Sequence, residues 1–335
     1  PGSEAVLSIL CLKAGAEKVY AIEYLQDTYE KARSKIESLG LENQIIVIHG
    51  DAMKTKLPEK VDYCISEIFG GIGGLEGAAA IINNAHRFLK DSSHVIPQKT
   101  ITKISALSLA PNRKIGFVQM AADYVERIFS HKGYRFDLRL RIKNVDKEDL
   151  CSSQGIFEDL DYRHELPLEH EHEIHLEFFK EGLCHGFLVW LTIQFDEENH
   201  LDVLESEDSW RPIFLPIWKE GILVSKGDVI EAKISRCLGE NGLNPDYRIV
   251  GKLVRISSKD IIPFEYESFH DKQIYCHNPF YAELFGGDSL PMLESFSITN
   301  VKDFLHKRIP EHMIPQSIIT VKNLATLSKE NRNEG

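Results

Sequence analysis

The 335-residue chain is long enough for two domains, and its composition, 43% hydrophobic and 27% charged, is that of an ordinary globular protein. Its net charge of −12 argues against a nucleic-acid partner, because phosphate backbones are bound by a surplus of lysine and arginine. The six cysteines are scattered and no apolar run approaches membrane-spanning length, so we expect reduced thiols in a cytoplasmic protein that binds no membrane.

Helices and short apolar strands alternate through the first hundred residues. The expected helices are 5–14, 27–39 and 77–89, and the expected strands are 18–23, 44–49, 61–67 and a stretch from Ser93 onward. Such alternation predicts an α/β fold with a doubly wound parallel sheet, whose ligand lies at the carboxyl ends of the strands. The opening Pro1-Gly2-Ser3 is interpreted as the surviving half of a glycine turn whose preceding strand is missing.

An acidic residue follows each of three successive strands. These residues are Glu23, Asp51 and Glu67. A carboxylate in the first of these places suits both hydroxyls of a ribose, and one in the second would lie beside an adenine amino group. A single acid after a strand is often merely solvated, but three at neighbouring strand ends favour a nucleoside cofactor.

Residues 66–77 form a glycine-rich loop with a carboxylate at each end. Glu67 ends the strand, and four glycines carry the chain to Glu76, nine positions later, where a helix is expected to begin. The alternative is that Glu67 is an ordinary strand-end acid and Glu76 an ordinary acid of a first helical turn, favoured by the helix dipole.

Residues 14–23 and 61–67, with Glu76, resemble the protein arginine methyltransferase family. The resemblance implies a seven-stranded Rossmann-like domain, with its first strand missing from this chain, that binds S-adenosyl-L-methionine. It also implies that Glu67 and Glu76 grip the nitrogen groups of the substrate. Two carboxylates suit a planar guanidinium and leave electron density on the attacking nitrogen.

The resemblance assigns further residues to the cofactor. It implies that Glu23 holds the ribose and that Asp51 and Ala52 flank the adenine, and we also place Gly2 and Ser66 at the cofactor.

Two features depart from the family pattern. The third glycine of the family's motif is replaced by Glu4 or Ala5. The bulky aromatic stretch between the two glutamates is replaced by glycines, which we expect to widen and loosen the pocket. Such a pocket would admit a larger substrate, or one delivered on an arm.

After Pro97 the pattern changes to many short strands, which predicts an antiparallel β-barrel. The expected strands are 134–142, 170–179, 185–195, 229–237 and 248–256. The family resemblance continues through residues 182–195, 208–214 and 225–228. Trp210 matches the tryptophan of a family loop that closes over the active site, whereas Ser209 replaces the loop's histidine. Trp210 therefore either lines the substrate cleft, as a catalytic-site residue, or belongs to the barrel core.

Residues 111–129 are expected to form a helical arm at the place of the family's dimerisation arm. Its apolar face predicts a homodimer, and the alternative is that it folds back onto its own domain. Residues 168–176 are rich in histidine, but without a convergent third ligand we interpret them as polar residues of a strand face and expect no metal.

The last segment of the chain has no counterpart in arginine methyltransferases. Residues 309–315, Ile-Pro-Glu-His-Met-Ile-Pro, resemble the late signature of adenylation domains in nonribosomal peptide synthetases. The alternative is a chance proline-bounded turn. The predicted domains are therefore 1–108 for the cofactor, 109–290 for the barrel and arm, and 291–335 for an adenylation remnant.

The leading hypothesis from the sequence is an S-adenosylmethionine-dependent methyltransferase of nonribosomal peptide biosynthesis. It would methylate an oxygen or nitrogen of a small or carrier-tethered substrate, held on phosphopantetheine, beside neighbouring synthetase domains. The alternatives are a protein arginine methyltransferase and a catalytically inactive scaffold that serves docking or dimerisation.

Overall fold

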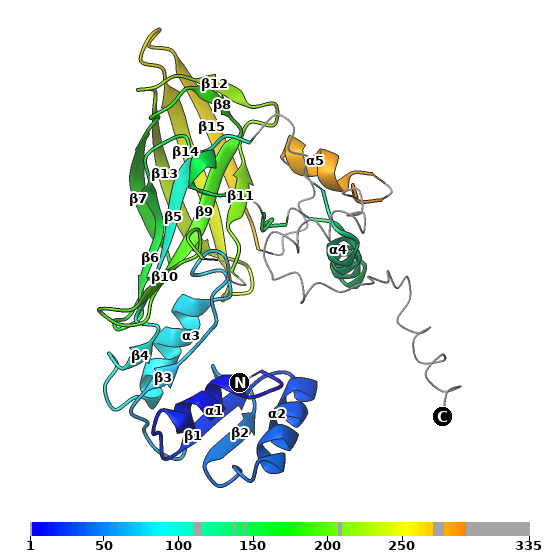
Figure 1. Cartoon of the computed structure of the whole chain (residues 1–335), viewed down its shortest axis with the longest axis vertical. Helices are drawn as coiled ribbons and strands as arrows, with labels where there is room; N and C mark the ends of the chain where they lie inside the picture. The colour runs from blue at the N-terminus through cyan, green and yellow to red at the C-terminus, as the bar shows by residue number, and fades with distance from the viewer. Residues whose placement is uncertain are drawn as a thin grey trace, which may run out of the picture. The chain divides into compact units, whose positions relative to one another are not determined.

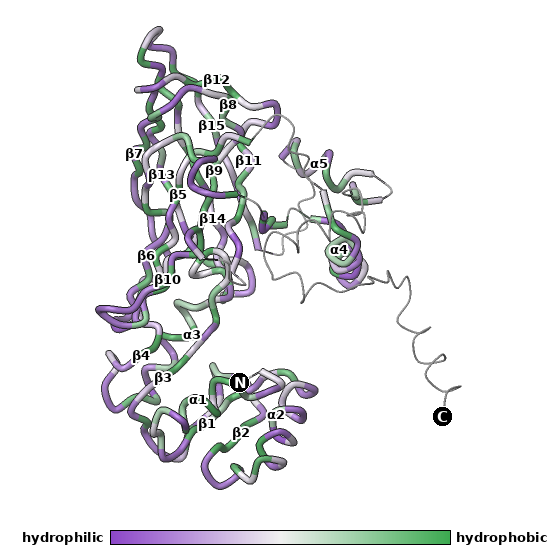
Figure 2. Tube along the Cα trace, viewed as in Figure 1, coloured by the Kyte–Doolittle hydropathy of each residue, from purple (hydrophilic) through white to green (hydrophobic). Residues whose placement is uncertain are grey.

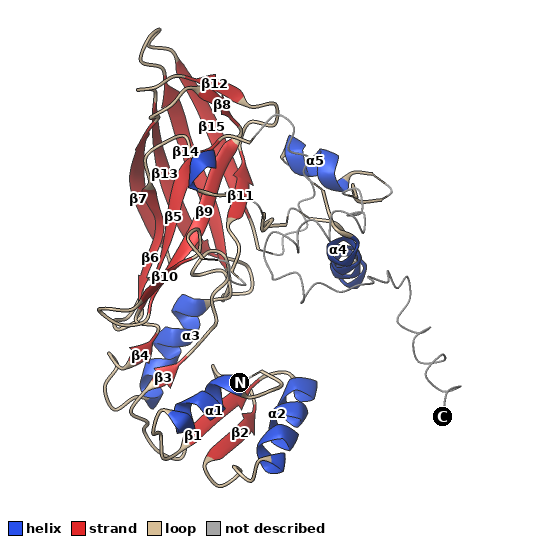
Figure 3. Ribbon diagram, viewed as in Figure 1, coloured by secondary structure: helices blue, strands red, loops and turns tan. Residues whose placement is uncertain are grey.

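The computed structural model describes residues 2–109, 116–136, 138–143, 145–206, 210–270, 278–287 and 289–292. The chain divides into two compact units, one of Pro1–Arg113 with Lys132–Gly287 and one of Lys114–His131 with Asp288–Gly335. The first unit contains parallel strands with helices, followed by antiparallel strands (Figures 1 and 3).

The first part of the larger unit alternates helices and parallel strands. In chain order these are α1 (Val6–Lys13), β1 (Val19–Glu23), α2 (Gln26–Ser38), β2 (Ile45–His49), β3 (Cys64–Ile65), α3 (Ala78–Ala85), the 3-10 helix η1 (His86–Phe88) and β4 (Val95–Ile96). The expected order is confirmed. The strand expected over 61–67 is shorter, because before β3 only Val61 is bridged, to Leu89.

The parallel strands form two pairs. β1 pairs with β2 and β3 pairs with β4, both in parallel. No strand among the described residues joins the two pairs.

A small apolar core lies between β1, β2 and the first two helices. It consists of Ala5, Ala21, Ala32, Ile36 and Ile45, of which Ala32 and Ile36 are one helical turn apart on α2. Ala5 has a φ of 49°, in the left-handed region that favours glycine. Ala5, one of the two residues expected in place of the family's third glycine, thus has a backbone conformation that favours glycine.

In the antiparallel part, the described residues form eleven strands. These are β5 (Lys99–Leu107), β6 (Gly155–Asp161), β7 (His170–Glu177), β8 (Gly182–Cys184), β9 (Gly186–Gln194), β10 (His200–Asp202), β11 (Ile213–Pro216), β12 (Ile222–Val224), β13 (Val229–Leu238), β14 (Pro245–Val254) and β15 (Ile261–Ser268). They pair in the orders β10-β9-β5-β6, with β11 also on β9, then β15-β14-β13-β7, and β12-β8.

Alternation of side chains explains the packing of these strands. Along β13 buried residues alternate with exposed or half-buried ones, and the tube in Figure 2 changes between green and purple there. β9 is buried along nearly its whole length, as expected of a strand covered on both faces. The predicted antiparallel barrel strands at 170–179, 185–195, 229–237 and 248–256 are therefore confirmed.

Two expected elements differ from the structure. Among the described residues of 134–142, ladder pairing is limited to a bridge between Arg141 and Ile213. The helix expected over 111–129 is α4, Gln119–Lys132, and it ends before Gly133, whose φ is 78°. Its buried residues are Ala122, Val125 and Phe129.

The remaining helices are the 3-10 helix η2 (Lys147–Asp149) and α5 (Pro279–Phe285). No described helix is long and apolar enough to span a membrane. The cysteines that the structure describes are all unpaired. Residues 309–315 lie outside the described part of the chain, and the predicted domain boundaries stay predictions.

Candidate active site

The carboxyl ends of β1 and β2 bring two of the predicted cofactor residues to one edge. Glu23 pairs in register with His49, so that Asp51 follows two residues beyond on the neighbouring strand. Both acids are half-buried. The Glu23 carboxylate accepts a hydrogen bond from the Leu25 N–H at 3.1 Å, and the Asp51 carboxylate accepts one from the Met53 N–H at 2.8 Å.

The other predicted cofactor residues lie near strand or helix ends. The Ala52 carbonyl accepts a hydrogen bond from the Arg87 guanidinium at 2.8 Å. The Ser66 N–H donates to the Ile96 carbonyl at 3.0 Å, which extends the pairing of β3 and β4 to the residue before Glu67. Gly2 precedes α1, is exposed and has a φ of 66°. Their contact with a cofactor stays a prediction.

The glycine-rich loop is pressed against the barrel. Residues 69–74 are all buried. A methyl group added at Gly71 would lie 2.9 Å from the Arg211 carbonyl oxygen, and one added at Gly73 would lie 2.5 Å from Thr100 Oγ1. The glycines therefore allow a close approach of the backbone to barrel atoms. Barrel atoms thus occupy the space that larger side chains would take at these two positions, and the expected widening of the pocket stays a prediction.

Hydrogen bonds fix the second half of this loop. The Gly73 N–H donates to Thr102 Oγ1 at 3.0 Å, and the Gly74 N–H donates to Glu158 Oε2 at 2.7 Å. The Leu75 carbonyl accepts from Asn244 Nδ2 at 2.9 Å. Three consecutive loop residues are thus bonded to side chains of the antiparallel part.

The two glutamates of the loop are exposed and interact electrostatically. The pKa of Glu67 is raised from its ordinary value, first by partial burial and then by the negative charge of Glu76, while the positive charge of Arg141 acts in the opposite direction. The loop therefore brings the two carboxylates close enough to repel each other. Such a pair has a strong affinity for a cation placed between them.

Glu76 lies just before a helix. α3 begins at Ala78, and its N-cap is Gly77, which has a φ of 81°. Glu76 therefore precedes the N-cap by one residue, where the positive end of the helix dipole still favours a carboxylate, and both interpretations of this acid stay predictions.

Arg141 is a site residue that the sequence did not indicate. A methyl group added at Gly70 would lie 3.6 Å from its Nη2 atom, and its charge acts on Glu67. Its backbone is bridged to Ile213 at the start of β11. It matches no motif, and it is separated from the loop by about seventy residues of chain, so no local pattern could have identified it.

Trp210 contacts the same loop near Glu67. Its ring is centred 5.5 Å from that of Phe69, two residues after Glu67, and the rings are tilted by 33°. It also packs against a buried cluster that includes Leu191 and Val203. Trp210 is therefore partly buried against this cluster, and a role in lining the substrate cleft stays a prediction.

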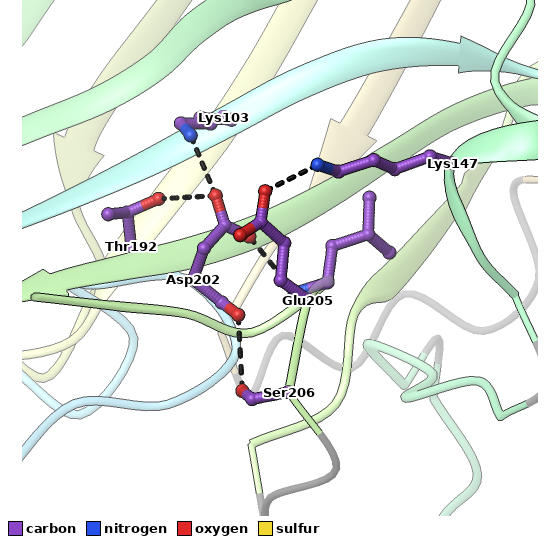
Figure 4. Close-up of polar contacts among 7 residues, drawn as sticks. Lys103, Lys147, Thr192, Asp202, Glu205 and Ser206 are labelled. Carbon is purple, nitrogen blue, oxygen red and sulfur yellow. Dashed lines mark hydrogen bonds and ion pairs between the residues drawn. The ribbon is translucent and has the colours of Figure 1, made fainter.

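A polar cluster holds the segment that leads toward Trp210 (Figure 4). The Asp202 carboxylate accepts hydrogen bonds from Lys103 Nζ at 2.7 Å and Thr192 Oγ1 at 3.1 Å, on the neighbouring strands β5 and β9. The Asp202 carbonyl accepts from Ser206 Oγ at 3.1 Å. Asp202 thus ties the turn after β10 to the antiparallel sheet.

Among the described residues, no group of three histidine, cysteine or acidic side chains is placed to hold a metal ion. The rings of His170 and His172 stack 5.4 Å apart, and His172 Nε2 lies 2.9 Å from the Ile156 carbonyl oxygen.

Comparison with known proteins relates this arrangement to arginine methyltransferases. No protein-family model matches the chain. Over 200 residues, or 57% of this chain, it is 29% identical to the histone-arginine methyltransferases CARMER of Drosophila ananassae and Drosophila persimilis. The chain spans only 38% of the length of these relatives.

Solved structures show the same fold. Protein arginine methyltransferase 10 of Arabidopsis thaliana matches with a TM-score of 0.62 at 19% identity, over 80% of this chain and 86% of that one. The Trypanosoma brucei PRMT1 enzyme–prozyme heterotetrameric complex with AdoHcy matches with a TM-score of 0.61 at 19% identity, over 79% and 85%. The fold is therefore the one expected, a Rossmann-like methyltransferase part followed by an antiparallel β-barrel, and the chain is similar in sequence to arginine methyltransferases.

Proposed function

We propose that this protein is an S-adenosylmethionine-dependent protein arginine methyltransferase. The observation that carries the proposal is the pair of carboxylates, Glu67 and Glu76, which interact across a loop fixed to the barrel. The sequence similarity to histone-arginine methyltransferases supports the same activity in preference to the synthetase hypothesis.

The residues at the strand edge fit a nucleoside cofactor. Glu23 and Asp51 are half-buried and follow neighbouring parallel strands, as ribose and adenine contacts require. We assign the ribose hydroxyls to Glu23, the adenine side to Asp51 and Ala52, and further cofactor contacts to Gly2 and Ser66. S-adenosylmethionine supplies a methyl group on a sulfonium, an electrophile that needs no further activation.

The glutamate pair is assigned to the acceptor. Two exposed carboxylates bind a guanidinium by charge-assisted hydrogen bonds and orient one nitrogen toward the methyl group. Glu67, whose pKa is raised, is the better candidate to take the proton lost by that nitrogen. Trp210, packed on Phe69, is assigned to the wall of the acceptor site.

Mass spectrometry tests the proposal directly. The protein is incubated with S-adenosylmethionine and an arginine-rich peptide, with the same peptide carrying lysine in place of arginine as the control. We expect mass increases of one or two methyl groups on the arginine peptide only. Methylation of neither peptide, with S-adenosylhomocysteine still bound in isothermal titration, would reject arginine as the substrate. Absence of that binding as well would favour the inactive scaffold.

A second candidate is methylation of a carrier-tethered substrate in nonribosomal peptide biosynthesis. Two sequence observations favour it, the segment 309–315 and the serine at position 209 where the family has histidine. The partners would then be a phosphopantetheine-bound aminoacyl group and neighbouring synthetase domains. A carrier-tethered aminoacyl substrate in the same assay separates the two candidates, because only this one predicts methylation of that substrate.

We also propose that α4 mediates a homodimer. Val118, Met120 and Tyr124, at and near the start of α4, are 44%, 79% and 60% exposed, which leaves apolar surface for a partner. Light scattering after size-exclusion chromatography should give twice the monomer mass, and Met120→Glu should reduce it to that of the monomer. A monomeric parent protein would instead indicate that the helix folds back.

A further inference from the structure

The carboxylate of Glu158 on β6 is buried beneath the glutamate loop. Glu158 is 4% exposed. Its Oε2 atom accepts a hydrogen bond from the Gly74 N–H at 2.7 Å. Its Oε1 atom accepts from Arg236 Nη1 at 2.9 Å and from Tyr247 Oη at 3.0 Å. One carboxylate therefore joins the loop to three strands, β6, β13 and β14.

The partners of Glu158 are themselves held in place. Arg236 is 7% exposed, and its Nη2 atom donates to the Pro167 carbonyl. Tyr247 is 2% exposed and its ring lies 5.1 Å from that of Phe157. A buried carboxylate is stable only with such a full set of donors, so the loop's N–H completes an arrangement that the barrel otherwise provides.

The residues on both sides of Glu76 are also fixed by the barrel. Leu75 is bonded through its carbonyl to Asn244, and a methyl group added at Gly77 would lie 2.7 Å from Leu243 Cγ. Glu67, in contrast, lies two residues after the end of the parallel strand β3, next to Ser66, whose N–H is bonded to the Ile96 carbonyl. The two glutamates are therefore placed by different parts of the fold.

We propose that Glu158 is a positioning residue that sets the place of Glu76 relative to Glu67 through the Gly74 N–H. The inference rests on the proposed function, in which these two glutamates together hold the acceptor. Glu158 itself does not touch the acceptor, since it is buried on the barrel side of the loop.

The first variant is Glu158→Gln. An amide has a single acceptor oxygen, so it cannot accept from both Gly74 and Arg236, and its NH₂ group faces another donor. We expect faster deuterium uptake in the peptide covering residues 70–77, and a fall of about 10²-fold in kcat/KM for the arginine peptide. Affinity for S-adenosylhomocysteine should stay within about twofold of the parent.

The matched control is Asp228→Asn. Asp228 is a fully buried carboxylate at the other end of β13 and accepts from the Ser225 and Ile256 N–H groups at 2.9 and 2.8 Å. Asp228→Asn should lower thermal stability but leave deuterium uptake by residues 70–77 and kcat/KM unchanged. The same effect on the loop from both variants would show general loosening of the barrel and overturn the proposal.

A second variant acts from the loop side and covers a failure of Glu158→Gln to fold. A methyl group at Gly74 would lie 2.7 Å from Glu158 Oε1, so Gly74→Ala should push the loop away with Glu158 intact. Its loss of kcat/KM and that of Glu158→Gln should not add in the double variant, because both break one contact. Additive losses would overturn the proposal.

Loop exchange also separates this inference from the proposed function. If the parent protein is inactive and deuterium uptake by residues 70–77 rises in Glu158→Gln, arginine methylation is rejected, but the conclusion that Glu158 holds the loop is kept. If deuterium uptake by residues 70–77 is unchanged in both Glu158→Gln and Gly74→Ala, Glu158 does not hold the loop, whatever the activity. If deuterium uptake by the loop rises but kcat/KM stays at the parent value, Glu158 has no role in positioning Glu76.

Discussion

The strand edge that carries Glu23 and Asp51 and the loop that carries Glu67 and Glu76 are built in different ways. At the strand edge, each carboxylate bonds to an N–H two residues further along the chain, and register between β1 and β2 brings them together. In the loop, the bonds reach residues as far as 84 and 169 positions away.

This difference predicts different consequences of mutation. At the strand edge each acid is bonded within its own neighbourhood in the chain, so its replacement should weaken ligand binding and leave the rest of the fold in place. In the loop the backbone is buried, so even a small change should move the exposed carboxylates. The predictions that follow test this contrast.

The largest effect is expected for the loop carboxylates. Glu67→Gln and Glu76→Gln should each lower turnover by about 10²–10⁴-fold, because the amide keeps the shape but removes charge and basicity. KM for an arginine peptide should rise, since a cation loses part of a doubly charged site. Cofactor affinity and thermal stability should change little. In the exposed control Glu42→Gln, turnover, KM, cofactor affinity and thermal stability should all stay near the parent values. Two fully active variants would show that the loop is not the active site.

At the strand edge the expected loss is in binding. Glu23→Ala should weaken the binding of S-adenosylhomocysteine by about 1–3 kcal/mol. The reason is that the variant loses a contact between the carboxylate and both ribose hydroxyls at a half-buried position. Isothermal titration measures this, with Glu42→Ala as the control. An affinity equal to that of the parent would remove Glu23 from the cofactor site.

The close packing of the loop predicts a cost for a single methyl group. In Gly71→Ala the new methyl group would lie 2.9 Å from both the Arg211 carbonyl oxygen and Ile213 Cδ1. We expect a loss of about 1–3 kcal/mol in the free energy of unfolding, measured with denaturant, together with lower turnover per folded molecule. Gly40→Ala is the control. Gly40 has a φ of 67° and open space around it, so stability should fall by about 1–2 kcal/mol with turnover unchanged.

The smallest effect concerns the titration of Glu67. Its pKa is raised by burial and by Glu76, and Arg141 opposes this. Removing the cation in Arg141→Leu should raise the pKa further, whereas removing the like charge in Glu76→Gln should lower it, each by less than about one pH unit. Carbon-13 NMR of the carboxyl group measures both without requiring activity, and Arg141→Lys should leave the pKa near its parent value.

The sign for the pH profile follows from the direction of the shift. If ionised Glu67 is needed, kcat/KM falls as the pH drops through the raised pKa, so Arg141→Leu should lose activity at a higher pH than the parent. A shift toward lower pH in that variant would contradict the placement of Arg141 beside Glu67.

The sequence predicted the strand edge well, because its evidence is local. Short apolar runs that end in acids located Glu23 at the last residue of β1 and Asp51 two residues after the end of β2. The close packing of the glycine-rich loop could not be predicted, since a run of glycines does not reveal which distant atoms occupy the space around it. Glu158 and Arg141 were missed, because each meets the loop only through tertiary folding, across a wide gap in the sequence.

The long separation in sequence between the loop and its bonding partners also determines the order in which parts of the chain fold during synthesis. β1, α2 and β2 lie within residues 19–49 and can pair soon after they are made. The loop is bonded to Glu158 and Asn244, and Glu158 is in turn bonded to Tyr247, so the loop's final conformation must wait until most of the barrel has emerged. We therefore expect a nascent chain to form the helices and strands around Glu23 and Asp51 well before the loop that carries Glu67 and Glu76 reaches its final conformation.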